Sequence, residues 1–74
     1  MRVDGHTLTD LQAQVLAEAR AYSEPTPLRA LALAIAQATG RKPGHVANAL
    51  VALRGKGLLV VGARGWYAPK AQGA

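Results

Sequence analysis

The sequence predicts a single, mainly helical domain that ends in a small β-hairpin. Apolar residues recur at helical spacing in three segments, which clusters of proline and glycine separate. After Gly57 the helical spacing of apolar residues stops. Two short runs rich in strand-forming residues follow, and they flank a glycine-bounded turn. The chain has 74 residues and no cysteine, so a core of aliphatic side chains and alanine must supply nearly all of its stability.

The first predicted helix begins at Thr9. Thr9 and Gln12 have the spacing of a capping box, and Asp10 suits the positive start of a helix. The helix is expected to end near Tyr22, because residues 23–27 contain two prolines. Its expected apolar face consists of Leu8, Leu11, Val15, Leu16, Ala19 and Tyr22.

The second predicted helix follows this proline-containing segment. Thr26 is expected to cap it, and Pro27 suits its first turn. Gly40 stands where a left-handed residue ends a helix. The expected buried face consists of Leu28, Leu31, Ala32 and Ile35.

The third predicted helix begins at Pro43 and ends at Gly55 and Gly57. Residues 58–61 and 66–68 then read as two strands joined by a tight turn at residues 62–65. Trp66 and Tyr67 alternate across this hairpin, so one of them is expected to pack on the helices. The apolar face of the third helix consists of Val46, Ala49, Leu50 and Leu53, and Leu50 is expected at the centre of the core.

The domain is expected to span residues 8–69, between a flexible lead at residues 1–7 and a flexible tail at residues 70–74. No apolar run approaches the length of a membrane span, and the first residues lack the apolar stretch of a secretory signal. These features predict a cytoplasmic protein without membrane contact.

Charge is distributed unevenly along the chain, whose formal net charge is +5. The four acidic residues all lie in the first third, and no acidic residue follows Glu24. Such a segment cannot neutralise itself, so it attracts a polyanion; the alternative is that the charges only keep the protein soluble. The basic residues after Pro25 are Arg29, Arg41, Lys42, Arg54, Lys56, Arg64 and Lys70.

The second and third predicted helices carry a recognisable pattern. An apolar-alanine pair at Ile35 and Ala36 precedes the turn at Gly40, Val46 follows in the next helix, and the pattern closes with Leu53, Arg54, Gly55, Lys56, Gly57 and Leu58. This pattern resembles the helix-turn-helix of MarR-type winged-helix regulators, and the opening helix also looks like theirs. The resemblance covers residues 8–68 and implies a three-helix winged helix-turn-helix that binds double-stranded DNA. The long terminal helices through which that family dimerises are missing, so a monomer or weak homodimer is expected.

The start of the third helix supplies the candidate base-reading residues. Because Val46 and Ala49 are expected in the core, Gly44, His45, Ala47 and Asn48 should be exposed. Asn48 can pair with an adenine edge through two hydrogen bonds, and His45 can donate to a base or a phosphate. The alternative for both is an ordinary solvated side chain.

Basic residues beside this helix supply the candidate phosphate contacts. Arg41 and Lys42 precede the helix and would reach phosphates. Arg64 lies at the tip of the hairpin, where the resemblance implies contact with the minor groove or the DNA backbone. The candidate DNA-binding set is therefore Arg41, Lys42, Gly44, His45, Asn48 and Arg64.

Enzymatic function is not expected, nor is a cofactor or a metal. The two histidines, His6 and His45, are far apart in sequence, there is no cysteine, and the glycines of the hairpin turn lack the following helix of a phosphate-binding loop. The main alternative to DNA binding is a protein-interaction module, with Val51 and the alanines of the third helix as its contact surface. Salt dependence separates the two, because only phosphate contacts release counterions.

Overall fold

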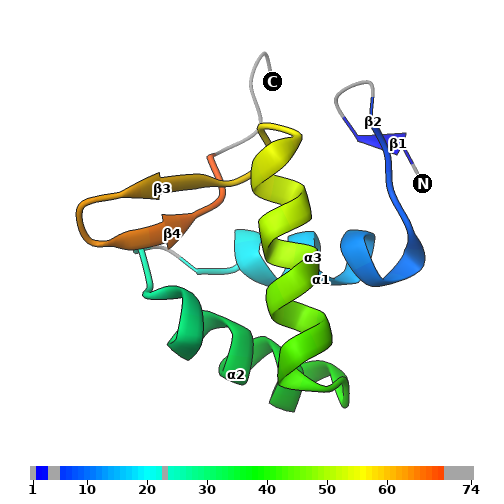
Figure 1. Ribbon diagram of the computed structural model, residues 1–74, viewed down its shortest axis with the longest axis horizontal. Coiled ribbons are helices and arrows are strands. Elements are labelled where there is room, and N and C mark those ends of the chain that lie inside the picture. The colour runs from blue at the N-terminus through cyan, green and yellow to red at the C-terminus, as the bar shows by residue number, and fades with distance from the viewer. Residues whose placement is uncertain (1, 4–5, 23, 70–74) are drawn as a thin grey trace.

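A computed structural model describes residues 2–3, 6–22 and 24–69. Its helices are α1 (Asp10–Arg20), α2 (Leu28–Thr39) and α3 (Pro43–Gly55), and an antiparallel hairpin of β3 (Val60–Gly62) and β4 (Gly65–Tyr67) follows them (Figure 1). The prediction of a mainly helical domain with a small β-hairpin is confirmed. The arrangement is consistent with a winged helix.

Capping residues define the helix boundaries much as predicted. The Thr9 Oγ1 accepts a hydrogen bond from the Gln12 N–H, and the Thr9 N–H donates to the Gln12 Oε1, both at 3.1 Å. Gly40 ends α2 in the left-handed conformation, with φ of 71°, and Pro43 is the first residue of α3. A capping box of this kind stabilises a helix by about 1 kcal/mol.

Two predictions about the chain between α1 and α2 are wrong. Tyr22 is exposed, because α1 ends at Arg20 and Tyr22 lies beyond its C-cap residue, Ala21. Thr26 does not cap α2; Pro27 takes that position, and no side chain caps the helix. The backbone of Thr26 instead pairs with Trp66 of β4, through Thr26 N–H to Trp66 O at 2.9 Å and Trp66 N–H to Thr26 O at 2.8 Å. This pairing holds Thr26 in an extended conformation beside β4, where the hairpin gains a third, one-residue strand.

The core lies where the three helices meet the start of the hairpin. Helix α3 packs on both α1 and α2. Leu50 and Leu53 of α3 have no exposed surface, which confirms that Leu50 is a core residue. Trp66 is half-buried and packs against the core, as predicted for one aromatic residue of the hairpin. The largest fully buried side chains are Val15, Leu16, Leu31, Ile35, Val46, Leu50, Leu53 and Leu59.

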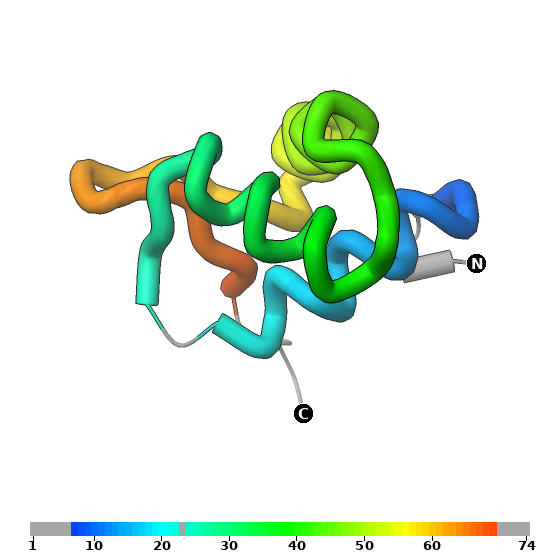
Figure 2. The backbone as a smooth tube through the Cα atoms, turned by 90° about the horizontal axis from the view of Figure 1, so that it is seen from below, coloured from blue at the N-terminus to red at the C-terminus, as the bar shows by residue number. Residues whose placement is uncertain are grey.

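In Figure 2, α3 is viewed nearly along its axis, and α1 and α2 both lie on one side of it, in agreement with the packing of α3 on both helices. The β3–β4 hairpin extends from one end of this arrangement (Figures 1 and 2). Within the described ranges, no helix combines the length and the apolar character that a membrane crossing requires.

The segment predicted as a flexible lead contains two short paired strands, β1 (Arg2–Val3) and β2 (His6–Thr7). The sequence did not predict them, because two-residue strands are too short to show a period. The predicted tail at residues 70–74 lies outside the described residues. Leu8 belongs to the core, and the predicted bounds of the domain stay a prediction.

Candidate nucleic-acid interface

The outward face of α3 presents few polar side chains. Helical spacing places Gly44, Asn48 and Val51 opposite the buried stripe, and all three are exposed, Val51 by 52%. The expected exposure of Gly44, His45 and Asn48 is confirmed, whereas their contacts with DNA stay predictions. Ala47 was expected to be exposed but is half-buried, because it packs against the core beside α2.

Three of the predicted site residues lie on the side of α3 that faces α1. The Arg41 Nε donates a hydrogen bond to the Gln14 Oε1 of α1 at 3.0 Å, which ties the α2–α3 turn to the first helix. His45 and Asn48 help to line a shallow hollow of about 250 Å³ between α3 and the start of α1. His45 therefore flanks the outward face of α3, whereas Asn48 borders both that face and the hollow.

Lys42 and Arg64 are separate from this group. Lys42 is exposed at the N-cap of α3, and no side chain caps that helix. Arg64 is exposed in the turn between β3 and β4. The hairpin turn and the α2–α3 turn lie at different ends of the molecule (Figure 1). A single ligand that contacts both residues must be extended.

Arg54 has a partner that the sequence did not indicate. Its guanidinium carbon lies 5.7 Å from the ring centroid of Trp66, within the range of a cation–π contact. This contact connects the last turn of α3 to β4, and it helps to orient the hairpin relative to α3. The sequence marked Arg54 only as one of the basic residues, because its distance from Trp66 depends on the tertiary fold.

The acidic side chains that the structure describes are confined to one stretch of the fold. Asp10 and Glu18 belong to α1, and Glu24 lies in the connection that follows it. Among residues 25–69, all of which the structure describes, every charged side chain is basic. The surface formed by α2, α3 and the hairpin is therefore positive, whereas α1 carries both signs, because it also includes Arg20.

A groove of about 510 Å³ runs between α2 and the first turns of α3. We call it the α2–α3 groove. One charged residue, Arg29, contributes to its lining. The other lining residues are apolar or glycine: Leu28, Ala32, Leu33, Pro43, Gly44 and Ala47.

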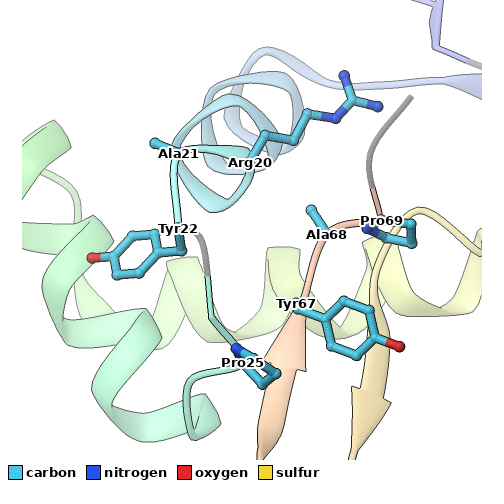
Figure 3. Close-up of a pocket in the computed structure, with 7 residues that line it drawn as sticks. All are labelled: Arg20, Ala21, Tyr22, Pro25, Tyr67, Ala68 and Pro69. Atoms are coloured by element: carbon cyan, nitrogen blue, oxygen red, sulfur yellow. The ribbon is translucent and has the colours of Figure 1, made fainter. Parts of the chain in front are cut away.

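A second hollow, of about 530 Å³, lies between the end of α1 and the end of β4 (Figure 3). It includes Arg20, Tyr22 and Tyr67 but none of the predicted site residues. The rings of Tyr22 and Tyr67 point to opposite sides, so they do not form an aromatic clamp (Figure 3). Within the described part of the chain, no three histidine, cysteine or acidic side chains gather closely enough to hold a metal ion.

Comparison of the chain with models of known protein families, with curated proteins and with solved structures gave no match.

Proposed function

We propose that this domain binds duplex DNA through α3 and the β3–β4 hairpin, as a small transcriptional regulator or accessory factor of the winged-helix type. The observation that carries the proposal is the charge segregation, with only basic side chains across α2, α3 and the hairpin. A surface of one sign attracts a polyanion, and a duplex is long enough to meet both turns of the molecule.

Binding to phosphates dominates this interaction. Lys42 and Arg64 are exposed at the two ends of the face, and Arg54 lies between them in the chain. Base-reading groups are fewer, since Asn48 and His45 are the polar side chains near the start of α3. Base contacts specify a sequence whereas phosphate contacts only position the protein, so one copy of the domain binds with little sequence preference. We further propose that it acts in the cytoplasm as a monomer or weak homodimer.

Neutralising Lys42 and Arg64 tests this interface directly. The double variant Lys42→Gln, Arg64→Gln should bind mixed-sequence duplexes at least about tenfold more weakly at low salt, because two phosphate contacts are lost. The log–log slope of affinity against salt should fall by about 2. Fluorescence anisotropy with a labelled duplex at several salt concentrations measures both quantities.

Arg20→Gln provides the matched control. It removes one positive charge from the last turn of α1, which lies beside the end of β4 and not at the hairpin turn or at α3, and should leave the salt slope unchanged. If Arg20→Gln weakened binding as much per charge as the double variant, net charge alone would govern binding. The proposed face would then be wrong.

A protein-interaction module remains the second candidate function. The α2–α3 groove favours it, because apolar residues line most of this concave surface and Leu33 at its edge is 48% exposed.

A further inference from the structure

We propose that the α2–α3 groove binds an acidic amphipathic helix of another protein. The apolar face of that helix would fill the groove, and its carboxylates would lie over the basic and N-terminal groups at the edge. This proposal goes beyond DNA binding, because it assigns a partner of stated chemistry to the apolar lining of the groove.

Leu33 of α2 is the large exposed apolar side chain of the groove lining. It is 48% exposed, and with its apolar neighbours it forms a concave surface that an apolar side chain of a partner can contact. Across the groove, Gly44 and Ala47 of α3 are small, so the backbones of the two helices leave room for an inserted side chain. Amphipathic helices bind such grooves through apolar residues spaced three and four positions apart.

The charge of the groove selects an acidic partner. Leu28 and Arg29 belong to the first turn of α2, and Pro43 and Gly44 belong to the first turn of α3, so two helix N-termini border the groove. No side chain caps either helix, and neither first turn contains an acidic residue. Helix N-termini carry partial positive charge, and Arg29 adds a full charge to the lining. Carboxylates of a partner would complement all three groups.

A second copy of this domain supplies no such helix. The acidic helix of the domain is α1, which carries Asp10 and Glu18. The exposed large apolar side chains among the described residues are Tyr22, Leu33, Val51 and Val61, and none belongs to α1. Because α1 has no exposed large apolar side chain, α1 of a second copy does not fit the groove.

A synthetic peptide tests the proposal. The probe is a helical peptide with leucines at positions i, i+3, i+4 and i+7 and glutamates on its other face. We expect it to bind the full chain, and we expect a peptide with lysines in place of the glutamates to bind at least about tenfold more weakly. Fluorescence anisotropy measures the affinities, and amide chemical shifts should change along the groove, at residues such as Ala32, Leu33 and Ala47.

The variant Leu33→Glu should weaken binding of the glutamate peptide at least about tenfold, because it removes an apolar contact and adds a repulsive charge. Leu33 is exposed, so the fold should tolerate the change. Ala30→Glu is the matched control, since it adds the same charge at an exposed position in the first turn of α2 but removes no apolar contact from the groove lining, and its effect should be smaller than that of Leu33→Glu.

Several results would overturn the proposal: no binding of the glutamate peptide, equal binding of the lysine peptide, or equal losses from the two variants. A shift from dimer to monomer on Leu33→Glu would show that a second copy covers the groove. A third result would assign the groove to DNA. In that case the wild-type chain binds neither peptide, and Leu33→Glu binds the duplex more weakly than Ala30→Glu does.

Discussion

Leu50→Ala should lower the free energy of unfolding by about 2–5 kcal/mol, a large part of the stability of a domain of this size. Leu50 has no exposed surface, and it lies in α3, which packs on both α1 and α2. Truncation removes buried apolar surface and leaves a cavity that three packed elements cannot readily close. Urea unfolding followed by far-UV circular dichroism measures the change.

The neighbouring residue Val51 provides the control for Leu50. Val51 is 52% exposed on the outward face of the same helix, so Val51→Ala should change the stability by less than about 0.5 kcal/mol. Similar losses for both variants would mean that the buried face of α3 is assigned incorrectly.

Gly65→Ala should destabilise the domain by at least about 2 kcal/mol and should disturb the hairpin first. Gly65 has a φ of 134°, which residues with a side chain rarely adopt. A Cβ at this position would also lie 2.6 Å from the Thr26 carbonyl oxygen and 2.7 Å from the Pro27 nitrogen. These atoms are backbone, so relief of the clash requires separation of β4 from the start of α2 and weakens the Thr26–Trp66 pairing.

Gly44→Ala is the matched control for Gly65→Ala. Gly44 lies in the first turn of α3, and a Cβ there would have no other atom within 4 Å. This variant should be as stable as the wild type or slightly more stable, because alanine is the better helix former. Trp66 fluorescence should change on Gly65→Ala and stay constant on Gly44→Ala. An unchanged melting temperature for Gly65→Ala would contradict the close contact between β4 and Thr26.

Local patterns predicted the helices well. Each of these helix boundaries depends on residues that are close to it in sequence. The examples are the capping box at Thr9, the left-handed Gly40 and the proline at the start of α3. The buried stripe of α3 likewise follows from helical spacing and one apolar face.

Contacts between distant residues were not predictable in this way. Thr26 looked like a helix cap because its partner, Trp66, is distant in sequence. The hydrogen bond from Arg41 to Gln14 joins residues 27 positions apart in sequence. It directs the Arg41 side chain, which was predicted to contact a phosphate, toward α1. The α2–α3 groove and the half-buried Ala47 likewise depend on how two helices cross, which no local pattern encodes.

A salt titration of duplex binding tests the proposed function most directly. The wild-type domain should bind a mixed-sequence duplex at low salt, and its log affinity should fall linearly with log salt with a slope of magnitude about 3–5. Each phosphate contact contributes a slope of about 0.9, and the described residues after Pro25 include six basic side chains, not all of which can reach the duplex together. An affinity independent of salt, or no binding at low salt, would contradict the proposal that this domain binds DNA through its basic face.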